Sequence, residues 1–328
     1  MLPQFSYVRP DTLKDTVKQL NAKGAAVHAG GTDLIGCLRE GIMDVDKVVS
    51  LSALPDLHGI KETAAGGLLI GALTTITAVS EDPLIRKKYP GLAQGAAEVA
   101  SPQLRNQGTI GGNLCQKPRC WYYRGEFDCL RKGGDTCYAL TGEHQFHAIF
   151  GHDRICVITH PSDTAPPLVA MGAKVRAMGP DGKRTIPVEN LHVLPRENAR
   201  AETVLTPGEV ITHIELPRPP ANLRSTYRKV RARRSWDFAL AGVALALEID
   251  GDTVKNGRVV LSGAAPVPWR SQPVEEVIQG RRLDAATIDK AAQAVVDGAD
   301  PLPGTAYKLD LFKGVIEEEL NAIQKANH

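Results

Sequence analysis

The stretch AAVHAGGTDLIGCLREG, residues 25–41, decides how the N-terminal part of the chain folds. Its apolar beginning, residues 25–29, predicts a short strand that Gly30 and Gly31 bring to an end. Residues 34–40 then have the pattern of a short helix, which the next glycine terminates. The stretch therefore predicts a strand, a tight glycine turn and a helix in immediate succession.

This glycine turn is a candidate anion site. Backbone N–H groups at a helix start can point toward a phosphate, and glycines let the phosphate approach the main chain closely. The sequence matches neither the dinucleotide-binding glycine pattern nor the Walker A loop, so a plain strand-to-helix turn is an equally good interpretation. Because Asp33 would repel a phosphate, we expect it, or Thr32, to cap the helix.

A second glycine-rich stretch, SPQLRNQGTIGGNL, covers residues 101–114. We expect a loop here, in which Asn106, Thr109 and Asn113 offer hydrogen-bonding side chains. Two separate glycine loops favour one long ligand with several phosphates, and a surface loop is the alternative. The basic run at residues 228–234 could reach the same ligand, although a solvated edge strand is its default interpretation.

Patterns of strand and helix alternate around these loops. We expect a strand at residues 153–161, then a helix that begins at the prolines of PSDTAPPLVAM, and a hairpin over residues 173–188. The proline-rich residues 215–224 predict a linker, and the helix that ends the chain carries an apolar stripe. The sequence therefore predicts an α+β protein of two domains, residues 1–219 and 224–328.

Four of the six cysteines fall within GNLCQKPRCWYYRGEFDCLRKGGDTCYALTG, residues 112–142. Pro118 and three glycines exclude a continuous helix, so something other than a hydrophobic face must hold this segment in place. Cys37 lies in an apolar helix, where we expect a core residue. The candidate metal ligands are Cys115, Cys120, Cys129, Cys137 and Cys156.

The spacing of these cysteines limits the kind of site. No paired C-x₂₋₄-C knuckle of the zinc-finger kind is present, and disulfides are disfavoured in cytosolic proteins. An iron–sulfur cluster tolerates irregular spacing, and its binding would offset the cost of ordering a long loop. Zinc and free or disulfide-bonded cysteines remain the alternatives. We expect the nearby histidines to be mostly solvated; these are His144, His147, His152 and His160.

Charge and hydropathy exclude several classes of partner. A net charge of +2 gives no reason to expect nucleic acid or an acidic membrane. No apolar run is long enough to span a membrane, and the N-terminus has no signal-peptide pattern. We therefore expect a cytoplasmic protein with no nucleic-acid partner and no membrane span.

Taken together, four motifs resemble the FAD-binding medium subunits of molybdenum hydroxylases. AGGTDL, SPQLRNQGTIGGNL, HPSD and YRKVRARRSWDFALAG occur here in the order seen in that family. The family includes carbon monoxide dehydrogenase, xanthine dehydrogenases and aldehyde oxidoreductases, and the resemblance covers essentially the whole chain. It implies a two-part FAD-binding domain of the PCMH type, followed by a smaller C-terminal α+β domain of the CO dehydrogenase flavoprotein type.

A long insertion, at about residues 116–156, separates GGNL from HPSD, where most members have a short connection. It resembles the branch with the 4-hydroxybenzoyl-CoA reductase β subunit and the periplasmic aldehyde oxidoreductase FAD subunit, which carry an additional [4Fe-4S] cluster. By this resemblance the ligands are Cys120, Cys129, Cys137 and Cys156. Cys115 is left out because cluster-free relatives can also have cysteine there, although spacing alone does not exclude it.

The resemblance also implies where FAD binds. The pyrophosphate would lie on residues 28–34, Asp163 would contact the ribose or isoalloxazine region, and Lys229 would approach the flavin ring. A cation there would favour a reduced, anionic flavin. The implied cofactor contacts are His28, Ala29, Gly30, Gly31, Thr32, Asp33, Leu34, Ser101, Asn106, Thr109, Gly112, Asn113, Asp163 and Lys229.

The implied function is that of an oxidoreductase subunit that relays electrons and has no catalytic residues for the organic step. Substrate would be oxidised on a large molybdenum-cofactor subunit. Electrons would pass through the two [2Fe-2S] clusters of a small subunit to FAD, and then through the [4Fe-4S] cluster to an external electron carrier. In the reductase branch the flow would be reversed.

The implied complex is a heterotrimer, alone or dimerised. An export signal on a partner would carry it to the periplasm, the alternative to the cytoplasm. Two other functions remain open, a self-contained FAD oxidoreductase and a zinc-stabilised, non-catalytic binding protein.

Overall fold

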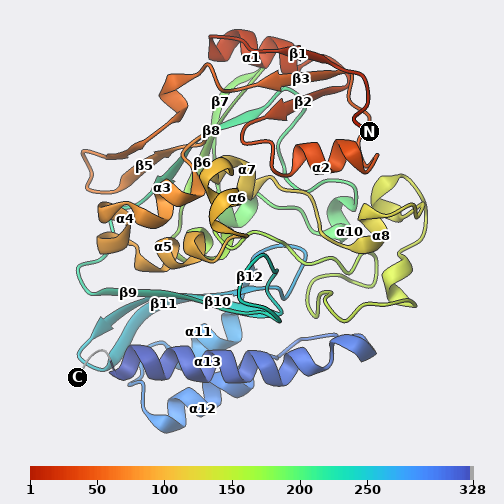
Figure 1. Cartoon of the computed structure of the whole chain (residues 1–328). Coiled ribbons are helices and arrows are strands. Elements are labelled where there is room, and N and C mark those ends of the chain that lie inside the picture. The colour runs from red at the N-terminus through yellow and green to blue at the C-terminus, as the bar shows by residue number, and fades with distance from the viewer. Residues whose placement is uncertain (326–328) are drawn as a thin grey trace.

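The computed structural model describes residues 1–325, which form three sheets that follow one another from top to bottom in Figure 1. A small parallel sheet comes first, a five-stranded antiparallel sheet lies in the middle, and a four-stranded antiparallel sheet backed by helices comes last. This mixed architecture confirms the predicted α+β fold class.

The first sheet carries the glycine turn. Its strands β1 (Ser6–Val8), β2 (Ala25–His28) and β3 (Lys47–Ser50) are parallel, in the order β1-β3-β2. Helix α1 (Leu13–Leu20) connects β1 to β2, and α2 (Leu34–Arg39) begins directly after the turn. The predicted succession of strand, glycine turn and helix is confirmed.

The second sheet joins distant parts of the chain. Its strands have the order β4-β5-β8-β6-β7, and every neighbouring pair is antiparallel. The central strand β8 pairs with β5 so that Leu216 lies opposite Leu68, whereas β6 and β7 form the predicted hairpin. The bounds are β4 (Ile60–Glu62), β5 (Leu68–Gly71), β6 (Lys174–Gly179), β7 (Gly182–Pro187) and β8 (Val210–Leu216).

Short helices fill the space beside this sheet. Residues 101–114, predicted as a loop, instead form two of them. At the start of the first helix, the Ser101 hydroxyl accepts a hydrogen bond from the Leu104 N–H. At the start of the second, the Thr109 hydroxyl accepts one from the Gly112 N–H. Helices this short show no period in the sequence. The bounds are α3 (Ile76–Glu81), α4 (Pro83–Lys88), α5 (Pro90–Ala97), α6 (Pro102–Gln107), α7 (Ile110–Leu114), α9 (Ala165–Ala170) and α10 (Pro195–Asn198).

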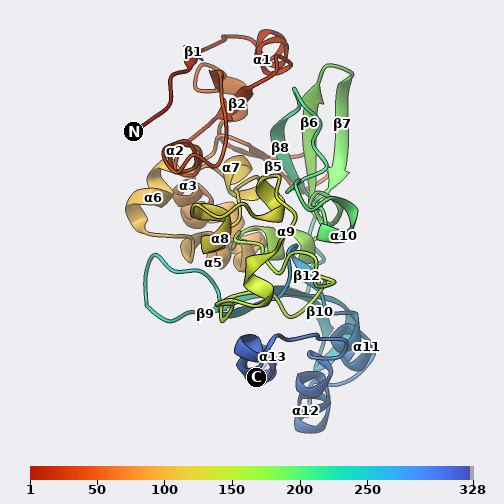
Figure 2. The same ribbon diagram turned by 90° about the vertical axis from the view of Figure 1, so that its right-hand side faces the viewer.

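The segment from residue 115 to residue 161 has little regular structure and lies along the side of the molecule that faces the viewer in Figure 2. It contains one short helix, α8 (Trp121–Arg124), and two 3₁₀ turns. The strand predicted at residues 153–161 is wrong, because this stretch pairs with no strand. Its apolar residues Val157 and Ile158 are buried by tertiary packing instead, which imitates a strand pattern in the sequence.

The two faces of the third sheet carry side chains of different size. Along β10, the large residues Val243, Leu245 and Leu247 pack toward the C-terminal helices, and Ala244 and Ala246 face the core around α9. The alternation follows from the two-residue period of a strand. The strand bounds are β9 (Leu223–Val230), β10 (Ala241–Asp250), β11 (Thr253–Ser262) and β12 (Trp269–Arg270). The helix bounds are α11 (Gln272–Ile278), α12 (Ala285–Ala294) and α13 (Tyr307–Lys325).

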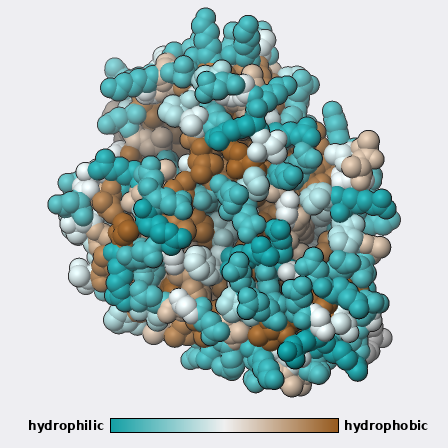
Figure 3. Space-filling view, turned by 180° about the vertical axis from the view of Figure 1, so that it is seen from behind, coloured by the Kyte–Doolittle hydropathy of each residue, from teal (hydrophilic) through white to brown (hydrophobic). Residues whose placement is uncertain are grey.

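The surface is consistent with this layered packing. Seen from behind, it is mainly hydrophilic, and hydrophobic side chains appear in small separate spots (Figure 3). Among residues 1–325, no helix has the length and apolar character needed to cross a bilayer.

Candidate cofactor-binding site

The glycine turn forms one wall of a cavity of about 590 Å³, which we call the glycine-walled cavity. Residues of β2, the turn, α2, α7 and β8 line it, together with the loop between β9 and β10. Its volume is in the range of sites that enclose a cofactor-sized ligand.

The glycines of the turn are required by close packing. A Cβ atom on Gly30 would lie 2.1 Å from the carbonyl oxygen of Gln107. Gly31 has a φ of +72°, a left-handed conformation that favours glycine. A Cβ on Gly111 would lie 2.8 Å from that of Ala72. The first glycine motif therefore packs directly on the second, and their backbones form one continuous wall.

Most of the predicted cofactor contacts lie on this cavity. The predicted residues that line it are Ala29, Gly30, Gly31, Thr32, Asp33, Leu34, Thr109, Gly112, Asn113 and Asp163. His28, Ser101, Asn106 and Lys229 are not among the lining residues. Ser101 caps α6, and the side-chain oxygen of Asn106 accepts a hydrogen bond from the Thr77 hydroxyl at 2.6 Å. The flavin contacts predicted for these residues stay predictions.

Asp163 lines the cavity as part of a buried network. Its carboxylate accepts hydrogen bonds at 2.7 Å from the Lys229 ammonium and at 2.7 Å from the Tyr227 hydroxyl. Burial raises the pKa of Asp163, and the neighbouring Lys229 opposes that shift. The Lys229 side chain is fully buried and paired with Asp163. The prediction that the basic run is solvated is therefore wrong for this residue.

Asp33 has a different role from the one the sequence predicts. It stands at the N-cap position of α2, yet its side chain accepts no capping hydrogen bond. Its carboxylate instead accepts from the Lys117 N–H at 2.7 Å and lies 2.8 Å from Arg119 and 2.9 Å from Arg124. The capping prediction is wrong, and Asp33 ties the glycine turn to the start of the cysteine-rich segment.

The four predicted cluster ligands line a second, small cavity, which we call the cysteine cavity. Cys120, Cys129, Cys137 and Cys156 come from separate places in the segment and all border a space of about 20 Å³. All six cysteines are free thiols. Cys115 lines the glycine-walled cavity instead, and Cys37 is fully buried, as predicted for a core residue.

The thiols of the cysteine cavity influence one another. A hydrogen bond between Cys137 and Cys156 lowers the pKa of Cys137 to about 6 and raises that of Cys156. Burial raises the pKa of Cys120 to about 11. Thiolates hold iron and zinc, so this donor set fits a metal centre. Within residues 1–325, however, no group of three or more His, Cys, Asp or Glu side chains is arranged to hold a metal ion directly.

The expectation that the nearby histidines are mostly solvated is wrong for two of them. His147 is buried, and its Nε2 lies 3.3 Å from the Cys120 sulfur. His152 is buried, and its Nε2 lies 2.9 Å from the Asp300 carbonyl oxygen. Burial lowers the pKa of His147 to about 4, so the imidazole beside Cys120 is neutral at pH 7.

Sequence reasoning missed a second carboxylate that joins the two cavities. Glu202 lines the glycine-walled cavity and lies 2.5 Å from the Lys117 ammonium and 2.6 Å from the Arg131 guanidinium. Arg131 borders the cysteine cavity, and only 3% of its side chain is exposed. The local sequence around Glu202 contains no signal for this contact, since its partners lie far away along the chain.

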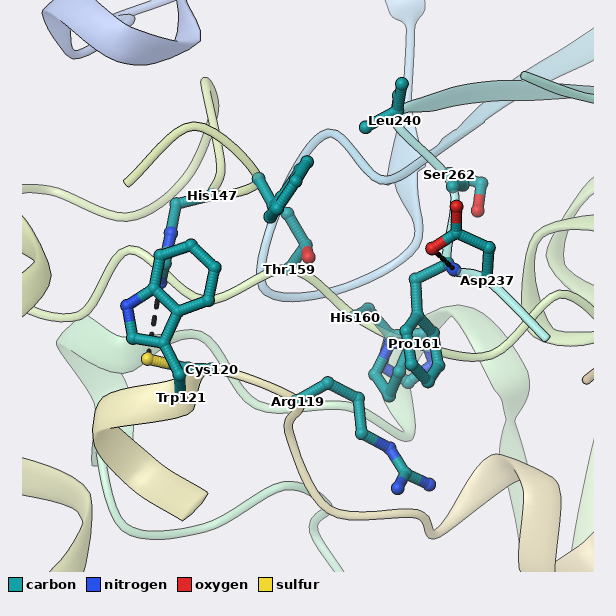
Figure 4. A pocket seen from close by; sticks show the side chains of 13 residues that line it. Arg119, Cys120, Trp121, His147, Thr159, His160, Pro161, Asp237, Leu240 and Ser262 are labelled. Atoms are coloured by element: carbon teal, nitrogen blue, oxygen red, sulfur yellow. Dashed lines mark hydrogen bonds between the residues drawn. The ribbon is translucent and has the colours of Figure 1, made fainter. Parts of the chain in front are cut away.

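A third cavity, of about 110 Å³, lies between the other two, and we call it the aromatic cavity. Trp121, Phe146 and Phe238 contribute its rings. It shares Cys120 and His147 with the cysteine cavity, and it shares Arg119, Pro161, Asp237 and Phe238 with the glycine-walled cavity. Figure 4 shows Arg119 between the side that carries Cys120 and Trp121 and the side that carries His160 and Pro161.

Two family models together match nearly the whole chain. Residues 3–219 match the FAD binding domain in molybdopterin dehydrogenase, and residues 225–318 match the CO dehydrogenase flavoprotein C-terminal domain. The first model alone covers more than half of the chain, and its match includes both glycine motifs.

Individual relatives agree with these models. The aldehyde oxidoreductase FAD-binding subunit PaoB of Escherichia coli is 35% identical over 96% of this chain and 97% of its own length. The carbon monoxide dehydrogenase medium chain of Hydrogenophaga pseudoflava is 25% identical over 98% of this chain and 97% of its own.

Solved structures have the same fold. Carbon monoxide dehydrogenase from Hydrogenophaga pseudoflava superposes with a TM-score of 0.78 at 24% identity, covering 100% of this chain and 99% of that one. Quinoline 2-oxidoreductase from Pseudomonas putida 86 gives 0.77 at 22% identity, with the same coverage. With both glycine motifs on one cavity wall and both family models matched in order, the chain belongs to the family of FAD-binding subunits of molybdenum hydroxylases.

Proposed function

We propose that this subunit relays electrons between a molybdenum-containing partner and an external carrier, with FAD in the glycine-walled cavity and a [4Fe-4S] cluster in the cysteine cavity. The supporting observation is that four free cysteines, spread over residues 120–156, border one space beside the cavity of an FAD-binding family. Single free cysteines are often buried as small apolar residues, but four around one space form a donor set of the size that an iron–sulfur cluster needs.

The glycine-walled cavity suits a dinucleotide for two reasons. The backbones of Gly30, Gly31 and Gly112 carry no side chain that would keep a pyrophosphate away. Asp163 offers a carboxylate for a sugar hydroxyl or a ring N–H, and Lys229 and Tyr227 hold that carboxylate in place. When bound, FAD supplies the ability to accept and return one or two electrons.

The cysteine cavity suits a cluster better than a single ion. A cluster is held by four thiolates that face a common space, whereas a single ion draws its ligands to one point. The open volume is about 20 Å³, so loading requires the four side chains to move apart. The segment that carries them has little regular structure to resist this. When bound, a [4Fe-4S] cluster supplies one-electron transfer.

The partners follow from the names and coverage of the relatives. Those relatives are a FAD-binding subunit and a medium chain, and each matches this chain over almost its full length. We expect a large molybdenum-cofactor subunit, a small [2Fe-2S] subunit and an external electron carrier to complete the system. In this reading, Arg119 and Cys120 border the aromatic cavity between the two proposed cofactors.

Anaerobic purification of the complex from its native host, with identification of the partner chains, tests this function. We expect one FAD and about four iron atoms per copy of this chain, beyond the iron of the small subunit. Cys120→Ser, Cys129→Ser, Cys137→Ser and Cys156→Ser should each lose the cluster signal in electron paramagnetic resonance. Cys115→Ser is the matched control and should keep it.

Three results would contradict the proposal. Zinc in place of iron would indicate a metal-stabilised protein without a relay. Loss of the signal in Cys115→Ser, with retention in Cys156→Ser, would mean a different ligand set. Substrate turnover by the isolated chain would indicate a self-contained FAD oxidoreductase.

A further inference from the structure

Arg119 is the one arginine or lysine among the described residues that lines both the glycine-walled cavity and the aromatic cavity. It directly precedes Cys120, which borders the aromatic and cysteine cavities. Its side chain therefore starts next to Cys120 and ends at the Asp33 carboxylate on the wall of the glycine-walled cavity, and Figure 4 shows the guanidinium on the side away from Cys120. Lys117 also lines the glycine-walled cavity, but its ammonium is paired with Glu202.

Three contacts hold this guanidinium in place. It lies 2.8 Å from the Asp33 carboxylate, donates to the Gln116 side-chain oxygen at 3.2 Å, and stacks 5.3 Å from the centre of the Phe238 ring. A planar guanidinium can make all three contacts at once, whereas a lysine ammonium cannot. The position is therefore built for arginine.

The Arg119 cation belongs to a cluster of charged side chains. The same Asp33 oxygen also lies 2.9 Å from the Arg124 guanidinium, so two guanidinium groups share one carboxylate. The other carboxylate on both cavities, that of Asp237, accepts backbone N–H groups from Arg233 and Phe238. Arg119 is therefore one member of a cluster with Arg124, Asp33, Glu40 and Asp237, and it is the cation of that cluster that lines both cavities.

We propose that Arg119 is the electrostatic link between the two redox centres, and that it raises the reduction potentials of both. This inference rests on the proposed function. A fixed cation stabilises the reduced, more negative form of any centre within reach, and more strongly where water is excluded. Because one charge acts on both centres, its removal would shift both potentials in the same direction.

Anaerobic redox titration tests this, with the flavin followed by visible absorbance and the cluster by electron paramagnetic resonance. In Arg119→Gln we expect both potentials to become more negative while FAD and iron contents stay at wild-type levels. Arg119→Lys, which keeps the charge, should restore most of both potentials. Arg124→Gln is the comparison variant, because Arg124 shares the Asp33 carboxylate but lines none of the three cavities, and its potentials should shift less than those of Arg119→Gln.

Two results would overturn the inference. One is unchanged potentials in Arg119→Gln. The other is an equal shift in Arg124→Gln, which would mean that the effect runs through Asp33. Should Arg119→Gln lose a cofactor, Arg119→Met carries the same test, because it also removes the charge but keeps a long side chain to pack on the Phe238 ring. Both of its potentials must then lie below those of the wild type, and unchanged potentials would refute the idea.

Wild-type protein without iron or flavin would instead defeat the proposed function, before any variant is made.

Discussion

The glycine-walled cavity and the cysteine cavity lie beside each other but are built in opposite ways. The first is walled by β2, α2, α7 and β8, whose backbone hydrogen bonds exist without any ligand. The second is enclosed by a long segment with one short helix and two 3₁₀ turns. The comparison indicates that regular structure prepares the first site, whereas the second would depend on the proposed metal centre and on a few charged contacts.

The largest expected effect comes from removing the proposed metal centre. Treatment of the reduced protein with an iron chelator, or the Cys156→Ser variant, should leave residues 116–156 open to protease while the three sheets stay protected. A metal that organises a loop contributes its binding free energy to that loop's folding. Limited proteolysis with mass spectrometry locates the cuts, and cuts spread evenly over all three sheets would contradict the comparison.

The next largest effect should follow from breaking the ion pair between Glu202, on the glycine-walled cavity, and Arg131, on the cysteine cavity. Glu202→Gln leaves the almost fully buried Arg131 without its carboxylate, and removing one partner of a buried ion pair costs about 3–5 kcal/mol. We expect a lower midpoint in urea unfolding and weaker retention of both cofactors.

The control for this variant is Glu62→Gln. Glu62 pairs with Lys88 at the surface, where its side chain is 48% exposed, so the loss should stay below about 1 kcal/mol. Equal losses of stability in the two variants would show that the ion pair of Glu202 with Arg131 stabilises the protein no more than a surface ion pair does.

A smaller effect is expected in the glycine turn. In Gly30→Ala the new Cβ would meet the Gln107 carbonyl oxygen at 2.1 Å, and the forced shift should cost about 1–3 kcal/mol and weaken FAD binding. Gly36→Ala is the matched control in the adjoining helix, because its nearest neighbouring atom lies 3.9 Å away. Calorimetry and flavin titration of both variants measure the difference, and equal behaviour would refute the tight packing of the turn.

The last effect is a slope with pH rather than a single loss, and it concerns Lys308, which contacts the cysteine-rich segment at Phe146. Its fully buried ammonium donates to the carbonyls of Phe146 and Gly263 at 3.3 and 2.8 Å, and burial lowers its pKa to about 7. Between about pH 7 and pH 10.4 the unfolded chain binds a proton there that the folded chain does not, so stability rises with pH by at most about 1.4 kcal/mol per unit. Lys308→Met should flatten this rise in unfolding experiments, and an unchanged slope would contradict the assignment.

The contrast between the two cavities also explains what the sequence could predict. The strand, glycine turn and helix at residues 25–41 were predictable, because each is decided by neighbouring residues. The 173–188 hairpin and the start of α9 follow local patterns in the same way. The ligand set came from resemblance, and the convergence of those cysteines depends on contacts that no local pattern encodes.

The errors have the same origin. Asp33 has the sequence position of a helix cap, but its partners Arg119 and Arg124 come from far along the chain. Val157 and Ile158 within residues 153–161 are buried without strand pairing, and in the sequence this burial looks like a strand. Lys229 belongs to a basic run that suggests a solvated face, yet its pairing with Asp163 in the interior is visible only in three dimensions.

The position of β8 has a consequence for biosynthesis. This central strand, Val210–Leu216, joins β5 to β6, so the middle sheet stays split until the ribosome has released most of the chain. By then the four cysteines of the cysteine cavity have already left the ribosome on an unfolded chain. Pairing of β8 with the distant strand β5 is slow, because it joins residues far apart in the sequence. The flavin and the proposed cluster would thus have access to the nascent subunit before its interior is sealed.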